Sequence, residues 1–317
     1  MLFKDIESDI HGLLRDDYVT TKKLEVVTRT ANGLTFTTHG EVDGRNVKSK
    51  AGARDLNIAS GLNLDNFQLM SDGRVLADAS LSVSDRVKLT VCAEDGRQEK
   101  GKASQSNGRL GIEFVTPRVG LTGEVDVVDG PKIGGSVLME HGGFLAGGLA
   151  QFNSQLDEKD RKAGLVDMGW CVGYRGDGWM ATAATAGNLS TLNLAFHQES
   201  ILRSSSGAST GLPNLPPGVK VGAVMAYGLQ EPRQRLTAGC SWQVDPSSRL
   251  RCKADSDGVV SFAFRHALSP FVALTLGARV DARDLTGGVE GGRTGGTEGR
   301  HPDALLPALG LSLSLGG

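Results

Sequence analysis

The first residues of the chain repeat apolar side chains with a helical period. Six of them recur mostly at spacings of three and four positions: Leu2, Phe3, Ile6, Ile10, Leu13 and Leu14. In a helix these spacings place all six on one stripe, and most of the positions between them are polar or charged. The pattern therefore predicts one amphipathic helix over residues 2–17.

After Tyr18 the apolar residues recur at every second position as far as Leu315. The alternating runs are about eight to eleven residues long and are separated by Gly, Asn, Asp and Pro, which is typical of strands joined by turns. The clearest hairpin joins Lys23–Ala31 to Leu34–Val42 through an Asn-Gly turn. The remainder of the chain repeats this arrangement, which predicts an all-β body.

The alternation is weaker between Glu94 and Val119. A hairpin is expected there between Val87–Glu94 and Lys100–Ser106, whereas the pattern from Asn107 to Thr116 does not define strand ends. Over the whole chain we expect roughly seventeen to twenty strands, most of them in hairpins.

The two faces of the expected strands differ in chemistry. Leu236, Ala238 and Cys240 share one face, and Arg235 and Thr237 lie on the other. Along the chain one face is made of Leu, Val, Ala and Phe, and the opposite face carries Glu, Arg, Thr, Ser and Gly. A long meander must hide its edge strands, and closure into a barrel does this in lipid. The sequence therefore predicts a transmembrane β-barrel with apolar side chains outside and water inside.

Composition agrees with a wet interior. The chain has 317 residues, of which 39% are hydrophobic, 5% are aromatic and 44 are glycine. This is little apolar material for a protein-filled core, but a barrel with a polar lumen does not need one. The formal net charge of −2 gives no electrostatic reason to expect nucleic acid. No secretory signal is visible and the helix is acidic, so we expect it to remain in the mature protein.

Candidate chemistry is sparse. The cysteines Cys92, Cys171, Cys240 and Cys252 lack the paired spacing of a zinc site or a redox couple, and we interpret them as small buried or lipid-facing residues. The six histidines have no metal-ligand spacing. Gly291-Gly292-Arg293 lacks the ending of a phosphate-binding loop. We therefore expect no enzyme, no metal and no cofactor.

Five stretches, in chain order, resemble the mitochondrial porin family, the voltage-dependent anion channels. They are LFKDIESDIHGLLRDDY near the start, KKLEVVTRTANGLTFTTHG in the first hairpin, GPKIGGSVLMEHGGFLAGGLAQFN in mid-chain, QVDPSSRLRCKADSDGVVSFAFRHALSPFVALTLGARVDA near the end and the final GLSLSLGG. The resemblance spans nearly the whole chain.

The resemblance implies a barrel of about 19 strands whose first and last strands pair in parallel, with the N-terminal helix inside the lumen. Residues 1–21 would form the helix and its linker, and residues 22–317 the barrel, with flexible loops at about 200–218 and 283–305. The implied function is a voltage-dependent channel of the mitochondrial outer membrane that passes ions, ATP, ADP and phosphate. The implied partners are membrane lipid, hexokinase-type and Bcl-2-type proteins and a second copy in a homo-oligomer.

The charged residues on the polar phase of the helix and strands are the candidates for the pore lining. They are His11, Arg15, Glu25, Arg29, Lys220, Arg235, Arg265 and Arg279. The resemblance further assigns a gating helix containing Lys4, Asp5, Asp9 and Asp16, and a closing-strand assembly signal containing Gly310, Leu313 and Leu315. The helix of the family usually carries more lysine, whereas only Lys4 and Arg15 are surely positive here, and this argues against a strong anion preference because the lining charge sets selectivity.

Three alternatives remain at this stage. One is a protein-import channel of the same barrel superfamily, which would translocate presequences. The second is a soluble β-sandwich binding protein, which carbonate extraction would release from membranes. The third is a bacterial porin, against which the lack of a visible signal peptide argues.

Overall fold

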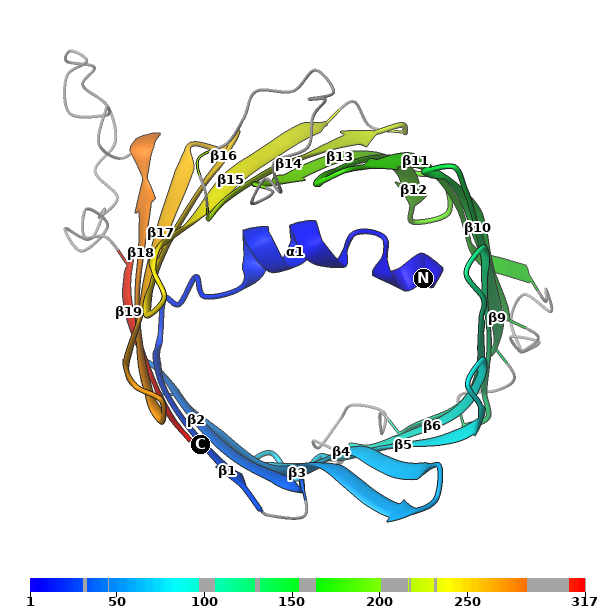
Figure 1. Cartoon of the computed structure of the whole chain (residues 1–317), viewed down its shortest axis with the longest axis horizontal. Coiled ribbons are helices and arrows are strands. Elements are labelled where there is room, and N and C mark those ends of the chain that lie inside the picture. Colours follow the sequence, from blue (N-terminus) through cyan, green and yellow to red (C-terminus); the bar gives the residue numbers. More distant parts are fainter. Residues whose placement is uncertain are drawn as a thin grey trace, which may run out of the picture.

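One sheet closes on itself to form the body of the molecule (Figure 1). The computed structural model describes residues 1–30, 33–44, 46–96, 106–128, 132–153, 164–200, 216, 218–230, 233–283 and 308–316. Within these residues the sheet has 19 strands, and neighbours in sequence are neighbours in the sheet. A single closed sheet confirms the predicted barrel and excludes the β-sandwich alternative, which needs two packed sheets.

The strands are joined as a continuous up-and-down meander. Their bounds are β1 Lys22–Arg29, β2 Thr35–Asp43, β3 Asn46–Ala59, β4 Leu62–Met70, β5 Val75–Ser84, β6 Val87–Asp95, β7 Asn107–Val115, β8 Val119–Asp126, β9 Lys132–His141, β10 Phe144–Asn153, β11 Gly164–Gly176, β12 Trp179–Ala186, β13 Thr191–Glu199, β14 Val219–Gly228, β15 Gln234–Asp245, β16 Ser248–Asp255, β17 Val259–Ser269, β18 Val272–Asp281 and β19 Ala308–Gly316.

The barrel closes through a parallel pair. Strand β1 pairs with β19 in parallel, with Leu24 opposite Leu313, while every other described pair is antiparallel. An odd number of strands in an up-and-down meander requires this one parallel contact, because the first and last strands then run in the same direction. The seam leaves the sheet without an open edge.

Side-chain direction follows the period of two along each strand. On β1, Leu24 and Val26 face outward and are 47% and 36% exposed, whereas Glu25 faces the lumen. Phe144, at the start of β10, is 67% exposed on the outer surface, and Leu145 beside it is buried inside. Apolar side chains therefore cover the outside, as the alternation predicts.

The strand prediction fails in one place. The strand that pairs with β6 is β7, with Glu94 opposite Asn107, whereas the predicted run Lys100–Ser106 lies, except for Ser106, outside the described residues. Two glycines, Gly108 and Gly111, interrupt the apolar alternation of β7 and hide it from a pattern search. The expected flexible loops at about 200–218 and 283–305 fall almost entirely outside the described residues.

The N-terminal segment lies inside the barrel (Figure 1) and has two helical pieces. A 3-10 helix, η1, covers Phe3–Asp5, and an α-helix, α1, covers Ser8–Arg15. The prediction of one helix over residues 2–17 is therefore correct in place but wrong in continuity. In the described part of the chain, no helix has the length and apolar character to cross a membrane.

Candidate functional site

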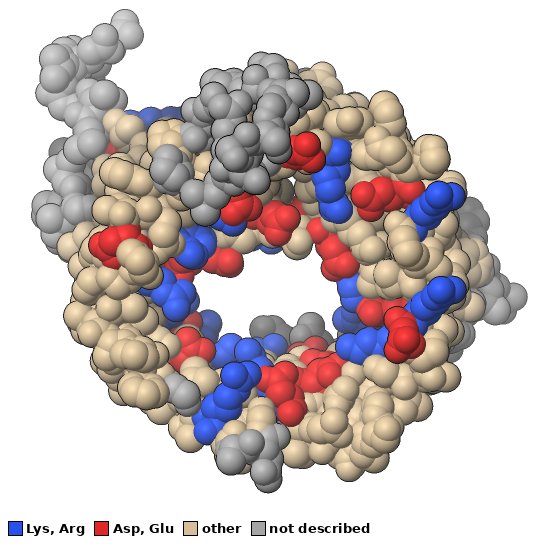
Figure 2. Space-filling model, in the orientation of Figure 1, with Lys and Arg blue, Asp and Glu red and all other residues tan. Residues whose placement is uncertain are grey.

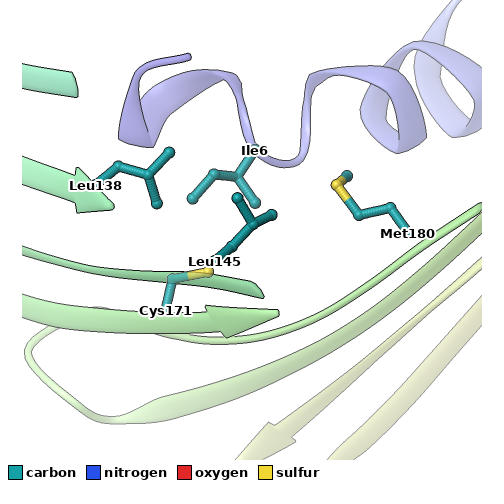
Figure 3. Packing of buried hydrophobic residues seen from close by; sticks show 5 residues of the cluster. All are labelled: Ile6, Leu138, Leu145, Cys171 and Met180. Atoms are coloured by element: carbon teal, nitrogen blue, oxygen red, sulfur yellow. The ribbon is translucent and has the colours of Figure 1, made fainter. Parts of the chain in front are cut away.

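The N-terminal segment attaches to the inner wall through its apolar stripe. Five of the six predicted residues are buried: Leu2, Ile6, Ile10, Leu13 and Leu14. Figure 3 shows Ile6 above Leu145 and Cys171 of the wall, with Leu138 on one side of it and Met180 on the other. Burial of each such side chain stabilises the docked segment by about 1.5–3 kcal/mol. The stripe thus builds a small apolar core in an otherwise polar lumen.

A second cluster holds the α-helix itself. Ile10 and Leu14 pack on Ala195 of β13, with Val224 of β14 against them. Two inward glycines make room for the helix. A Cβ added at Gly222 would lie 2.9 Å from Leu13 Cδ2, and one at Gly239 would lie 2.8 Å from Leu14 Cδ2. The wall at β14 and β15 therefore accepts the helix because it has no side chains at these two positions.

Two cations of β16 hold the C-terminal end of α1. The guanidinium of Arg251 donates to the carbonyl oxygens of Gly12 at 2.8 Å and Asp16 at 3.2 Å. The ammonium of Lys253 donates to the carbonyl oxygen of Leu14 at 2.8 Å. The last carbonyls of a helix lack partners within it and carry partial negative charge. Arg251 and Lys253 satisfy these groups and thereby fix the end of the helix.

The residues after α1 strengthen this attachment. Asp17 lies 3.3 Å from Arg251 Nε and 3.6 Å from an Nη of Arg265. The Lys253 ammonium lies 4.5 Å above the ring of Tyr18, a cation–π contact. Burial raises the pKa of the Tyr18 phenol, so this residue stays neutral at physiological pH.

The linker to β1 crosses glycines of the last two strands. A Cβ at Gly277 of β18 or at Gly310 of β19 would overlap the carbonyl oxygen of Val19. Any side chain at either position would push the linker off the wall. Gly310, which the resemblance assigns to an assembly signal, lies where the linker crosses β19.

The wall of β1–β6 lies away from the helix and is polar (Figure 1). Lys23 pairs with Glu41 at 3.5 Å, and Lys88 pairs with Asp65 at 3.4 Å. A recess of about 790 Å³ opens at one end of the lumen, and its lining includes four arginines and two acids: Arg29, Arg54, Arg249, Arg265, Glu25 and Asp55. Figure 2 shows charges of both signs around a central opening and few on the outer rim.

This arrangement, a closed barrel of 19 strands with an amphipathic helix on its inner wall, can be compared with known proteins. The sequence profile described as "Eukaryotic porin" matches residues 1–290. The chain belongs to the eukaryotic porin family. This porin is therefore a channel-forming membrane protein of the mitochondrial outer membrane and not an enzyme, and the family excludes the bacterial-porin alternative.

Individual relatives are distant but match over most of their length. The porin is 22% identical over 294 residues to the "Mitochondrial outer membrane protein porin" of Neurospora crassa, covering 89% of this chain and 93% of that protein. It is 23% identical over 276 residues to "Non-selective voltage-gated ion channel VDAC2" of Xenopus laevis, covering 84% and 86%. A solved anion-selective porin from Comamonas acidovorans is 10% identical, covers 82% of this chain and 86% of that one, and has a TM-score of 0.31. That score is too low to support an argument.

All six pore-lining candidates on the strands face the lumen of the porin. Three of them make ion pairs there: Lys220 with Glu199 at 2.7 Å, Arg235 with Asp255 at 3.6 Å and Arg265 with Asp17. Glu25 and Arg29 line the recess, and Arg279 shares the inward phase of Gly277. The period of two located these residues because it alone decides which face a strand residue occupies.

The candidates on the helix are dispersed along it. Lys4 forms an ion pair with Glu113 of β7 at 2.5 Å, and His11 lies 3.3 Å from Glu7. The carboxylate of Asp5 accepts from the Leu2 amide at 3.2 Å. The other three, Asp9, Arg15 and Asp16, are exposed in the lumen.

The remaining candidates lie at the seam. Leu313 and Leu315 of β19 face outward, and Leu313 lies between Leu24 of β1 and Leu274 of β18. Among the described residues, no group of three or more His, Cys, Asp or Glu could hold a metal ion.

Sequence reasoning missed the residues that hold the helix end. Arg251 and Lys253 lie on the polar phase of β16, which marks them as lumen residues. Nothing local to β16 shows that the helix ends beside it, because that contact joins parts of the chain more than 230 positions apart.

Proposed function

We propose that the lumen is a voltage-dependent diffusion path for ions and small metabolites, including ATP, ADP and phosphate. The observation that carries the proposal is the open, charge-lined passage beside the docked helix (Figure 2). The helix occupies one side of the lumen, and the wall of β1–β6 opposite it stays free of the helix (Figure 1). Solutes would pass along this polar wall, past Glu25, Arg29 and their neighbours.

The charge pattern supports weak selectivity. Lumen cations are paired with acids across neighbouring strands, as in Lys23–Glu41 and Lys220–Glu199. A neutralised pair contributes little net field to an ion passing several ångströms away, because the two potentials nearly cancel. The acids on the helix oppose a net positive lining. We therefore propose a channel with a small preference between chloride and potassium.

Voltage dependence would arise from charges that sense the field across the membrane. A charge that crosses the full field gains about 2.3 kcal/mol per 100 mV. We propose that the segment containing Lys4, Asp5, Asp9 and Asp16 contributes to this response, with residues 1–21 acting as one unit and residues 22–317 as the barrel. Docking of hexokinase-type and Bcl-2-type proteins and formation of a homo-oligomer complete the proposal and rest on the resemblance.

The test is the reversal potential of the purified, refolded protein in a planar bilayer under a KCl gradient. Large openings that close at high voltage of either sign, with a small reversal potential, are expected. A cation-preferring channel blocked by a presequence peptide would favour the import alternative. Absence of conductance from folded protein would contradict the proposal.

An adjacent pair of lysines provides the matched variants. Lys23 faces the lumen and Lys22 faces outward at the start of the same strand. Lys23→Gln should shift the reversal potential toward potassium, because it leaves the charge of Glu41 unopposed. Lys22→Gln should leave it unchanged. Equal shifts for both variants would show that the lumen face of β1 does not line the path.

A further inference from the structure

Two cysteines whose spacing in the sequence suggests no pair face each other on neighbouring strands. Cys240 of β15 is directly opposite Cys252 of β16. Their Sγ atoms are 3.2 Å apart, and both thiols are free and half-buried. The other two cysteines, Cys92 and Cys171, belong to β6 and β11.

A β-bulge creates this pairing. At the turn Asp245 is opposite Ser248, and continuing that register down the strands would place Cys240 opposite Lys253. The register shifts between Gln243 and Asp245, so that Gln243 is opposite Arg249 and Cys252 moves opposite Cys240. The spacing of the two cysteines in the sequence therefore does not predict that they lie opposite each other.

The two thiols lie on the outer face of the barrel. Gly239 and Arg251, their neighbours in sequence, face the lumen, where they meet Leu14 and the end of α1. Because side chains alternate between the two faces along a strand, Cys240 and Cys252 point to the outer face. Trp242 and Leu250 share their phase and are 46% and 39% exposed. In the membrane this face contacts lipid, and both cysteines lie well inside their strands rather than at the ends.

The geometry suits a disulfide. Residues directly opposite each other in an antiparallel pair have Cα atoms about 4.5–5.5 Å apart, which lies within the range that disulfides span. An S–S bond is about 2.05 Å long, so the two sulfur atoms need to approach by about 1 Å. The two sulfur atoms are already within hydrogen-bonding distance, and either thiol can be the donor.

We propose that Cys240 and Cys252 form an oxidisable dithiol site that reacts with organic hydroperoxides dissolved in the membrane. One sulfur attacks the outer peroxide oxygen, the O–O bond breaks, and the hydroperoxide leaves as an alcohol with the thiol's proton. The sulfenic acid formed then reacts with the second thiol, an S–S bond forms and water leaves. In sum two thiols and one hydroperoxide give one disulfide, one alcohol and one water.

The position of the pair selects this class of oxidant. Hydroperoxides carried on acyl chains or other apolar groups reach the lipid-facing surface, whereas charged thiols and disulfides in water do not. A resolving thiol within contact distance is the feature that directs a sulfenic acid to a disulfide rather than to higher oxides. Cys92 and Cys171 face the lumen, and neither has a cysteine opposite it: the residues opposite Cys92 are Asp78 and Arg109, and those opposite Cys171 are Gly147 and Ala184.

The site also lies behind the helix attachment. Cys252 is flanked by Arg251 and Lys253, whose side chains hold the end of α1 from the opposite face of the same strand. A disulfide would fix the β15–β16 register next to this attachment. The proposal does not depend on which solutes pass through the lumen.

The test uses the full chain refolded into phosphatidylcholine vesicles and treated with cumene hydroperoxide. Trypsin cleavage after Arg235, Arg249, Arg251 and Lys253 separates Cys240 and Cys252 into the peptides Leu236–Arg249 and Cys252–Lys253. We expect these two peptides to be joined, with a mass lower by two hydrogens, and to separate after reduction. Two of the four thiols should be lost. The double variant Cys92→Ser/Cys171→Ser should give the same joined peptide.

Variants in which Cys240 is replaced test whether Cys252 needs a partner thiol. In Cys240→Ser and Cys240→Ala, Cys252 should instead progress to sulfinic or sulfonic acid, because its resolving partner is gone. Circular dichroism and protease resistance establish that both variants are folded. The proposal is overturned if the wild-type cysteines become separate oxyacids without the joined peptide. It is also overturned if neither of them reacts faster than Cys92.

Discussion

The two sides of the lumen are lined by different kinds of residue although they belong to one sheet. The wall of β9–β16 presents small or apolar inward residues, such as Gly222, Gly239 and Leu145, and it binds the helix (Figure 1). The wall of β1–β6 presents charged inward residues such as Glu25 and Lys88, which stay in contact with water. The difference shows that inward-facing residues of this barrel are polar where the strand contacts water, and small or apolar where the helix covers the strand.

The largest effect should come from the apolar contact of the helix-bound wall. Ile10 is 1% exposed, and Ile10→Ala should weaken docking of α1 by about 2–5 kcal/mol, because it leaves a cavity against Ala195. Hydrogen exchange of the amides of residues 8–15 should accelerate accordingly. Asp9→Ala, on the exposed side of the same helix, is the control and should change exchange little. Equal acceleration in both variants would mean that the helix is not held by its apolar stripe.

The next effect concerns the polar attachment of the helix end. Arg251→Met removes two charge-assisted hydrogen bonds to helix carbonyls and should weaken docking by about 1.5–3 kcal/mol. The same exchange measurement detects it, with the loss greatest at the C-terminal turn of α1. Arg279→Met, which removes an exposed lumen cation on β18, is the matched control. An unchanged last turn in Arg251→Met would contradict the role assigned to this residue.

The open wall should respond in conductance rather than in docking. A unit charge 10 Å from the ion path contributes about 0.4 kcal/mol in water, a factor of about two in local ion concentration. Glu25→Lys changes the charge by two units and acts in opposite directions on chloride and potassium. After screening by salt it should therefore raise the ratio of chloride to potassium permeability by about threefold. Val26→Thr, which faces lipid on the same strand, should not change this ratio. A helix that exchanges faster in Glu25→Lys would show that the two walls are coupled.

The smallest effect lies outside both walls, in the turn between β4 and β5. Hydrogen bonds from the backbone amide of Arg74 at 3.1 Å and from its guanidinium at 2.7 Å lower the pKa of the Asp72 carboxyl. A lowered folded-state pKa adds stability that is present above the unfolded value, about 3.9, and is lost as the pH falls through the folded value.

Asp72→Asn should therefore reduce the thermal midpoint slightly at pH 7 and not at all at a pH below the folded-state value. Melting curves at both pH values test this. Asp85→Asn, in the turn between β5 and β6, is the control for loss of a turn carboxylate. A larger deficit at low pH than at pH 7 would contradict the sign of the argument.

Much of the fold is visible in the sequence because strand residues alternate with a period of two. That period placed Glu25, Lys220 and Arg279 in the lumen without further information. The parallel seam and the place of the helix followed only from resemblance to a family, since no local pattern states which strands meet at closure.

Three features of the structure could not be predicted from local sequence patterns, each for a physical reason. The helix breaks at Ile6–Glu7, although the apolar stripe continues through the break. The role of Arg251 depends on a contact with the other end of the chain. The Cys240–Cys252 pair depends on a one-residue bulge, and a bulge leaves no mark in the apolar pattern.

The parallel seam has a consequence for the order of assembly. Leu24 and Leu313 come from opposite ends of the sequence, so their pairing has the longest loop to close. Every hairpin can form from neighbouring segments, but the ring is incomplete until the final strand arrives. Until then the growing sheet has two unpaired edge strands, each able to pair with a strand of another chain. Ring closure is therefore expected to be the slow step of biogenesis, and the interval before it the period in which the chain is most prone to misassemble.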